Sequence, residues 1–224
     1  MAALGLRGKS LLALLLSCLL AFVFAGFIGR EALLGVQSRF GEAYARNVVQ
    51  LNRERLFAPV SRELALAHRL AASQLTLAWL NDEQDPAKRK IFFQEAAGYQ
   101  QAFGDHAYFA ASASSNGYYS NGPDQSPSDA PRYVMAPDGP RDEWFFQTLQ
   151  ADTPYAINVD RSVVTGELKV WFNVQVRDGD RRLGLVGSGI SLQAFLDDFI
   201  EANKVGVESM VLDAYGSILV HPNQ

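Results

Sequence analysis

The stretch "LKVWFNVQVRDGDRRLGLVGSGI", Leu168–Ile190, indicates an antiparallel hairpin in which two long strands are joined by a short turn. Asp178-Gly179, at the centre of "RDGDR", is a dipeptide that favours a two-residue hairpin turn. Apolar and polar side chains alternate along the first strand. One face carries Val170, Phe172, Val174 and Val176, and the other carries Trp171, Asn173, Gln175 and Arg177. The apolar face predicts a core, whereas the other face could either pack under a helix or line a ligand pocket.

Around this hairpin, the sequence predicts an α+β fold with an antiparallel sheet. Strand patterns occur in "HAYFAASA", "SNGYYSN" and "YAINVD", and helical patterns in "AKRKIFFQEAAGYQQAF" and "SLQAFLDDFIEAN". The Pro- and Ser-rich "GPDQSPSDAP" predicts a loop. Near the end, "ESMVLDAYGSILVHPNQ" predicts a strand-turn-strand that begins a second sheet at 204–224, so we expect a longer protein.

The segment "RDEWFFQTL", Arg141–Leu149, predicts a short helix with two different faces. Phe145, Phe146 and Leu149 are expected to dock this helix on the core. Arg141 and Trp144 lie one helical turn apart and are expected to face a ligand.

The N-terminal part contains an uncharged run, "SLLALLLSCLLAFVFAGFIG", at 10–29. About 20 apolar residues suffice to cross a bilayer as a helix. Arg7 and Lys9 precede the run, which favours a cytoplasmic N-terminus at 1–9 and places the following residues on the other side of the membrane. The alternative is a cleaved signal peptide, with Val23 and Ala25 before the cleavage site.

Residues 30–80 predict a long helical stalk. Apolar residues recur at steps of three and four from Leu33 to Leu51. Pro59 is expected to kink or break this helix, and Ser61 is a candidate N-cap for the segment that follows.

Charge and motifs exclude several functions. Residues 31–224 hold 17 basic and 24 acidic residues, a net charge of −7, which gives no basic face for nucleic acid. Cys18, the only cysteine, lies in the apolar run, so disulfides and Cys-based metal sites are not expected. His68, His106 and His221 share no metal-ligand spacing, and no catalytic motif is present. We therefore expect no catalytic site, metal or cofactor.

A ligand pocket remains as the functional hypothesis. Polar and aromatic side chains that converge from a sheet and its covering helix are typical of small-molecule sites. The candidate ligand-binding residues are Arg141, Trp144, Tyr155, Asp160, Trp171 and Asn173. For Trp171 and Asn173, packing under the helix that contains Arg141 is an equally good interpretation.

The segments from "RDEWFFQTL" to "VLDAYGSILVHPN" resemble the extracytoplasmic double Cache sensor of bacterial transmembrane signalling proteins. The resemblance implies a membrane-distal PAS-like ligand module at 81–203, the start of a membrane-proximal one at 204–224, a homodimer, and an inner-membrane location with residues from about 30 onward in the periplasm. It also implies a cytoplasmic output, such as a chemoreceptor, histidine kinase, diguanylate cyclase or PP2C-type phosphatase module. The style of this sequence is closest to the diguanylate cyclase and phosphatase sensors.

Amino-acid-binding members of that family hold the ligand carboxylate with an Arg near a Trp-aromatic pair, and the amine with an Asp. Here Arg141 and the Trp144-Phe145 pair are present, although two residues separate Arg from Trp instead of one. Ala136 stands where a Tyr is expected, and Gly189 where the Asp is expected. The resemblance therefore favours a carboxylate or another small polar metabolite, with Asp160 or Asn173 as substitutes for the missing groups.

The prediction is a membrane-anchored ligand sensor, with a diguanylate cyclase as the first choice of output. A phosphatase, chemoreceptor or histidine kinase output is the alternative within the same class. An envelope enzyme and a structural module without a ligand are alternatives from other classes.

Overall fold

The computed structural model describes residues 6–195, 211–212 and 218–220. The chain divides into two compact units, Met1–Leu51 and Asn52–Gln224. Helix α1, Leu6–Ala71, forms the described part of the first unit and continues into the second. From Ser10 onward it contains a stretch that is long and apolar enough to cross a membrane, judged by length and composition alone.

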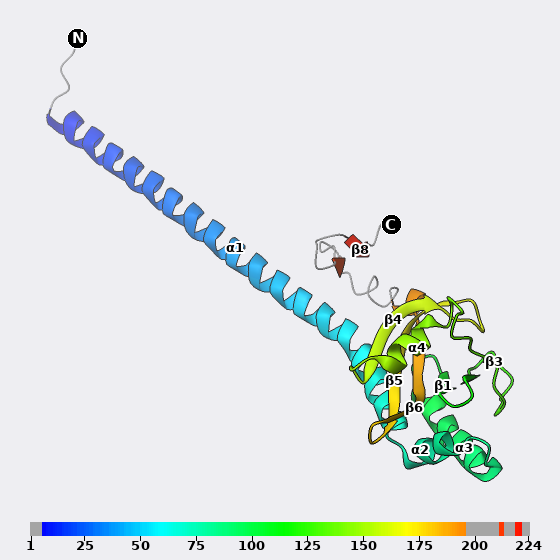
Figure 1. The fold of residues 1–224 in the computed structure, drawn as a ribbon. Helices are drawn as coiled ribbons and strands as arrows, with labels where there is room; N and C mark the ends of the chain where they lie inside the picture. The colour runs from blue at the N-terminus through cyan, green and yellow to red at the C-terminus, as the bar shows by residue number, and fades with distance from the viewer. Residues whose placement is uncertain (1–5, 196–210, 213–217, 221–224) are drawn as a thin grey trace. The chain divides into compact units, whose positions relative to one another are not determined.

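The second unit is built on a six-stranded antiparallel sheet, visible in Figure 1. Its strands follow the order β3-β2-β1-β6-β5-β4. Their bounds are β1 Tyr108–Ser112, β2 Gly117–Asn121, β3 Tyr133–Val134, β4 Tyr155–Arg161, β5 Leu168–Asp178 and β6 Arg181–Ser191. The β5–β6 hairpin lies inside the sheet, and Gly179 adopts the left-handed conformation (φ 59°) at its turn, as the Asp-Gly dipeptide predicts. The α+β prediction is thus confirmed.

One face of the sheet packs on helices. The end of α1 lies there together with α2, Gln74–Asn81, and α3, Pro86–Ala102. Val174 and Val176 of β5 point into this layer, which confirms the apolar face read from the alternation. Trp79 of α2 stacks on Phe92 of α3, with ring centroids 4.2 Å apart, and both side chains are fully buried.

The opposite face carries helix α4, Glu143–Gln150, and a second apolar cluster. Phe145 of α4 and Phe109 of β1 are buried in this cluster. Phe146 and Leu149 pack at its edge, so the predicted docking side of "RDEWFFQTL" is confirmed.

The helix boundaries near Pro59 differ from the prediction. Pro59 lies inside α1, and the helix continues to Ala71. A proline removes one backbone hydrogen bond, but burial of Ala67 and Leu70 against the sheet favours continuation of the helix. The break comes instead at Ser73, whose side chain accepts a hydrogen bond from Leu75 N as the N-cap of α2; Ser61 is not a cap.

Two predictions fall largely outside the described residues. The helix expected at 191–203 extends beyond residue 195, where the description stops. At the end of the chain, β7, Val211–Leu212, pairs antiparallel with β8, Ile218–Val220, in agreement with the expected strand-turn-strand. A complete second PAS-like module stays a prediction.

Candidate ligand-binding site

Helix α4 is held over the sheet at both of its ends. Near its start, the buried side chain of Asp142 accepts a hydrogen bond from Ala136 N at 2.9 Å. At its end, Gln175 of β5 donates from Nε2 to the carbonyl oxygens of Thr148 and Ala151, at 2.5 and 3.0 Å. Thr148 O also accepts a hydrogen bond from Ala151 N at 3.3 Å, and Gln175 adds a cap from the sheet to the last carbonyls of the helix. The position of α4 leaves a pocket between its N-terminal turn and the sheet.

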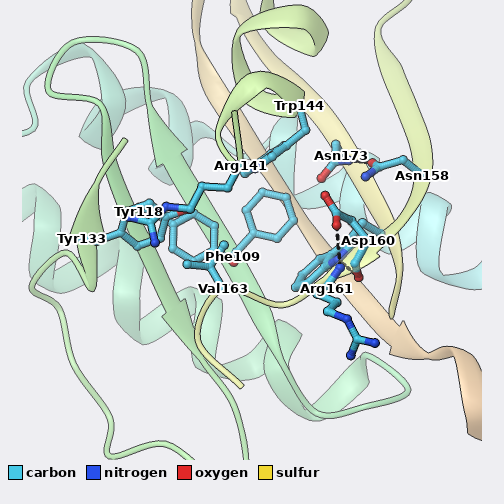
Figure 2. A pocket seen from close by; sticks show the side chains of 11 residues that line it. Phe109, Tyr118, Tyr133, Arg141, Trp144, Asn158, Asp160, Arg161, Val163 and Asn173 are labelled. Atoms are coloured by element: carbon cyan, nitrogen blue, oxygen red, sulfur yellow. Dashed lines mark hydrogen bonds between the residues drawn. The ribbon is translucent and has the colours of Figure 1, made fainter. Parts of the chain in front are cut away.

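Aromatic rings form the apolar part of this pocket (Figure 2). Phe109 is at the centre: the ring of Trp144 meets it edge-on at 5.6 Å, and that of Trp171 at 5.8 Å. Tyr118 stacks beside Phe109 at 5.7 Å. Edge-to-face pairs of this kind fix ring orientations, so the apolar wall is preformed.

Arg141 supplies positive charge at one side of the pocket. Its guanidinium carbon lies 5.5 Å from the centroid of the Tyr133 ring, within the range of a cation–π contact. Burial and the nearby Asp142 carboxylate raise the pKa of Tyr133, so its hydroxyl stays protonated. The Arg141 side chain is exposed and makes no hydrogen bond or ion pair in the described part of the chain, which leaves its N–H groups available to an anion.

The wall across the pocket from Arg141 is polar and comes from β4 and β5 (Figure 2). Asn173 Nδ2 donates a hydrogen bond to Asn158 Oδ1 at 2.5 Å. Trp171 Nε1 donates to the backbone carbonyl of Asp160 at 3.1 Å, which ties the edge strand β4 to the pocket floor. The Asp160 carboxylate accepts a hydrogen bond from Arg161 N at 2.7 Å.

Glycines of β6 make room for the rings in the floor. A Cβ on Gly189 would lie 2.7 Å from Trp171 Cε3, and a Cβ on Gly187 would lie 2.9 Å from Phe109 Cε1. Both distances are shorter than side chains tolerate. Gly187 and Gly189 therefore permit close packing of rings against β6, and Gly189 is required for the flat placement of Trp171.

The pocket is small. Its empty space, mouth included, is about 360 Å³, but the centres of water molecules can occupy only about 30 Å³. The larger volume includes open solvent. A ligand of few atoms fits this space, whereas a peptide does not.

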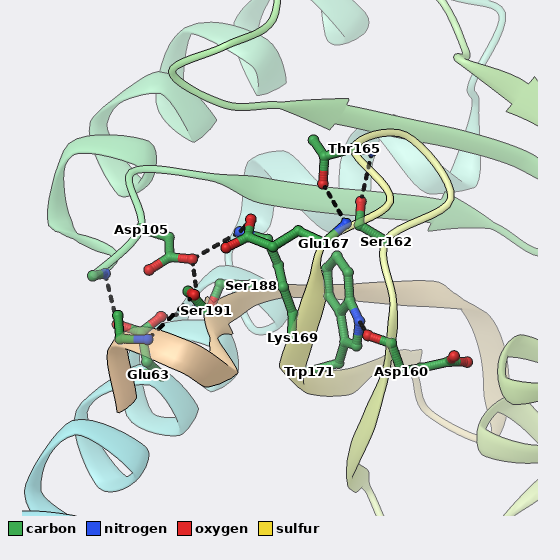
Figure 3. Close-up of polar contacts among 12 residues, drawn as sticks. Glu63, Asp105, Asp160, Ser162, Thr165, Glu167, Lys169, Trp171, Ser188 and Ser191 are labelled. Carbon is green, nitrogen blue, oxygen red and sulfur yellow. Dashed lines mark hydrogen bonds and ion pairs between the residues drawn. The ribbon is translucent and has the colours of Figure 1, made fainter. Parts of the chain in front are cut away.

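A polar network beneath the pocket joins the sheet to helix α1 (Figure 3). Glu63 of α1 is buried, and its carboxylate accepts hydrogen bonds from Ser188 Oγ at 2.5 Å and Gly104 N at 2.8 Å. Ser188 lies between the two pocket-floor glycines. Next to Gly104, Asp105 accepts from Lys169 Nζ and Ser191 N, both at 2.7 Å.

The structure brings five of the six predicted site residues to one pocket: Arg141, Trp144, Asp160, Trp171 and Asn173. The sixth, Tyr155, points to the other face of β4, where its ring meets His68 of α1 edge-on at 5.5 Å. Asn158 and Asp160 of β4 face the pocket, and Tyr155 lies an odd number of residues from both, so it is on the other face of the strand.

Six further residues line the pocket: Phe109, Tyr118, Tyr133, Asn158, Arg161 and Val163. Asn158 shares its strand face with Asp160 and could have been found from alternation alone. Tyr133 supplies a tyrosine three positions before Ala136, the position where the sequence comparison expected one. Phe109 and Tyr118 come from strands whose place in the sheet depends on pairing, which the sequence does not reveal.

Within the described residues, no group of three or more His, Cys, Asp or Glu side chains is arranged to hold a metal ion. The pocket's chemistry consists of ring faces, guanidinium groups, carboxamides and one carboxylate. Such a set can bind and orient a small polar molecule.

No protein-family model matches the sequence. Several solved structures are similar in fold. The ligand-binding domain of the Pseudomonas fluorescens chemoreceptor CtaA, in complex with L-serine, aligns with a TM-score of 0.56 and 17% identity over 80% of this chain and 71% of that one. The ligand-binding domain of the Campylobacter jejuni chemoreceptor Tlp3, in complex with L-valine, aligns with a TM-score of 0.63 and 8% identity over 79% and 69%.

The sensor domain of the Vibrio cholerae histidine kinase DctB aligns with a TM-score of 0.58 and 10% identity over 78% of this chain and 64% of that one. Identities this low show a common fold and carry no ligand from one protein to another. The expected likeness to sensor domains is confirmed at the level of the fold: this chain has the fold of ligand-binding sensor domains of chemoreceptors and of a histidine kinase.

Proposed function

We propose that this chain is the ligand-sensing part of a membrane-anchored signalling protein and that its pocket binds a small carboxylate or another small polar metabolite. The observation that carries the proposal is Arg141 at an aromatic pocket whose opposite wall is polar. A guanidinium that makes no hydrogen bond or ion pair with the described residues can form charge-assisted hydrogen bonds with a carboxylate. The fold shared with ligand-binding sensor domains supports the same proposal.

The route from pocket to membrane would be helix α1. Trp171 lies on Gly189, its neighbour Ser188 holds Glu63, and Glu63 belongs to the helix that contains the apolar run. A ligand that moves Trp171 would therefore act on a strand that is hydrogen-bonded to α1. Such coupling requires that the ligand bind two arrangements of these elements with different affinity.

Membrane anchoring and dimer formation belong to the same proposal. The apolar run at 10–29 supports an anchor, with residues from about 30 onward in the periplasm. Beyond the run, α1 exposes Leu33, Val36, Phe40 and Tyr44, and a second copy of the helix would cover this stripe in a homodimer. The diguanylate cyclase output is an expectation from the sequence resemblance, and the similar structures make a chemoreceptor or a histidine kinase output equally worth testing.

The proposal is tested by thermal unfolding of the full chain in lipid nanodiscs against a panel of small carboxylates, sugars and amines. At least one carboxylate should raise the melting temperature, and Arg141→Ala should remove that rise. If no compound raises the melting temperature, or if Arg141→Ala leaves every rise unchanged, the proposal is wrong.

A further inference from the structure

The pocket wall formed by Asn158 and Asn173 contains information about the ligand beyond its carboxylate. Asn173 is 1% exposed in the middle of β5, and Asn158 lies on the same face of the neighbouring strand β4. Asparagine has no ionised form, so this pair of carboxamides is neutral at every physiological pH. This inference rests on the proposed function, because it concerns the same pocket.

The hydrogen bond between the two side chains fixes what they offer to a ligand. Asn173 Nδ2 donates to Asn158 Oδ1, and neither carboxamide makes another hydrogen bond within the described residues. The oxygen of Asn173 and the NH₂ group of Asn158 are therefore left for a ligand, together with the second N–H of Asn173. If the bond ran in the opposite direction, the pair would still offer one acceptor and one NH₂ group.

A ligand group that pairs with both the free oxygen and the free NH₂ group must donate and accept hydrogen bonds at the same time. A hydroxyl or a carboxamide does so. An ammonium group has only donors and would leave the NH₂ group without a partner, whereas a second carboxylate has only acceptors and would face the free oxygen. We infer that the ligand carries a neutral hydroxyl or carboxamide group at the Asn158–Asn173 wall, in addition to a carboxylate at Arg141.

The charges around the pocket agree with this choice. Its ionised groups are Arg141, Arg161 and Asp160, which sum to one net positive charge. That sum matches a ligand with one negative charge better than a zwitterion. The competing arrangement places an ammonium group on Asp160, but this carboxylate is exposed and already accepts a hydrogen bond from Arg161 N.

The test uses pairs of monocarboxylic acids that share a skeleton and differ only in a hydroxyl or an ammonium group: lactate and alanine, and glycerate and serine. Each is titrated calorimetrically into the full chain in nanodiscs. Within at least one pair, the hydroxy acid should bind about 5- to 150-fold tighter, the range expected when one buried polar group loses its partner.

Asn158→Asp adds a carboxylate to the wall and should move the affinity ratio of that pair at least 10-fold toward the amino acid. Asn116→Asp, in the turn between β1 and β2, adds the same charge outside the pocket and should leave the ratio unchanged. Asn158→Asp is preferred to Asn173→Asp because Asn158 is only half-buried. If Asn158→Asp fails to fold, the affinity ratios of hydroxy acid to amino acid measured on the unaltered chain decide whether the inference holds.

Two results would overturn the inference while the proposed function stands. In the first, an amino acid binds as tightly as its hydroxy partner and Asp160→Asn weakens it, which assigns the ammonium group to Asp160. In the second, carboxylates bind and depend on Arg141, but no hydroxy acid is preferred. If no acid binds and Arg141→Ala has no effect, the proposed function fails and this inference fails with it.

Discussion

The hydroxyl of Ser188 donates a hydrogen bond to the carboxylate of Glu63 across 2.5 Å, and both side chains are buried. This contact joins the strand under the pocket to the long helix α1. The other carboxylate oxygen of Glu63 accepts a hydrogen bond from Gly104 N, in the loop before β1. A single acidic side chain thus holds three segments of the chain together beneath the pocket.

Removal of this carboxylate should destabilise the domain. Glu63→Ala leaves the buried Ser188 hydroxyl without an acceptor, at a cost of about 1–3 kcal/mol, and it also removes the acceptor of Gly104 N in the exposed loop before β1. The melting temperature should fall by roughly 2–4 °C per kcal/mol in a domain of this size. Glu63→Gln keeps one acceptor oxygen, so its melting temperature should fall less than that of Glu63→Ala. Glu42→Ala, at an exposed position of the same helix, is the control, and an equal effect of the two alanine variants would contradict this role.

Gly189→Ala should impair the pocket more than the fold. A methyl group at this position would lie 2.7 Å from the Trp171 ring, which must then move from the pocket floor. We expect the tryptophan emission to shift and the affinity for the best-binding carboxylate to fall at least 10-fold. Gly98→Ala, in helix α3 with open space around it, should leave both unchanged. Unaltered binding by Gly189→Ala would mean that Trp171 does not contact the ligand.

The segment 141–149 should separate stability from binding. Phe145 is fully buried, and Phe145→Ala should lower the free energy of unfolding by about 3–5 kcal/mol. Trp144 is only half-buried over the pocket, so Trp144→Ala should cost less stability and weaken ligand binding. Denaturant unfolding and titration of both variants check this division. It is wrong if Trp144→Ala binds like the unaltered chain.

The acid stability of the domain should depend on a hydroxyl cage around Glu83. Burial raises the pKa of Glu83, but hydrogen bonds from Ser112, Tyr119, Ser115 and Ser114 outweigh it and hold the pKa below its usual 4.5. A carboxyl whose pKa is lowered by folding stabilises the folded state above its unfolded pKa. This stabilisation is lost as the pH falls through the folded value.

Ser112→Ala removes one donor, raises the pKa of Glu83 and should move the midpoint of acid unfolding to higher pH. Tyr119→Phe should act in the same direction. Ser126→Ala, in the loop between β2 and β3, is the matched control. Acid titrations followed by circular dichroism measure the midpoint, and identical midpoints for Ser112→Ala and the control would show that the cage does not set the acid limit.

The sequence predicted those parts of the fold that depend on local chemistry. Alternation in β5 separated Val174, in the core, from Asn173, in the pocket, and Asp178-Gly179 located the hairpin turn. Of the predicted kink or break at Pro59, the break does not occur, because tertiary packing of Ala67 and Leu70 favours a continuous helix. Local propensity is a weak guide where a helix is held by its buried face.

The pocket could be predicted in part, because some of its residues follow from local helix spacing and strand alternation. Arg141 and Trp144 share a helical turn, and Asp160 follows from the parity of β4. Tyr155 lies on the face of β4 opposite to Asp160, so its ring contacts His68 instead of the pocket. Phe109 and Tyr118 reach the site through the pairing of β1 with β6 and of β2 with β1. Such long-range pairing leaves no local mark in the sequence.

Arg141 is proposed to bind the carboxylate of a small ligand in this pocket. The most direct measurement is a calorimetric titration of the full chain in nanodiscs with the carboxylate that gives the largest thermal shift. Arg141→Ala is compared with Arg181→Ala, which removes the same charge from the exposed β5–β6 turn. Charge-assisted hydrogen bonds of about 1.5–3 kcal/mol predict that Arg141→Ala weakens binding about 10- to 150-fold and Arg181→Ala does not. Equal affinities for the two variants would contradict the proposed binding of the carboxylate by Arg141.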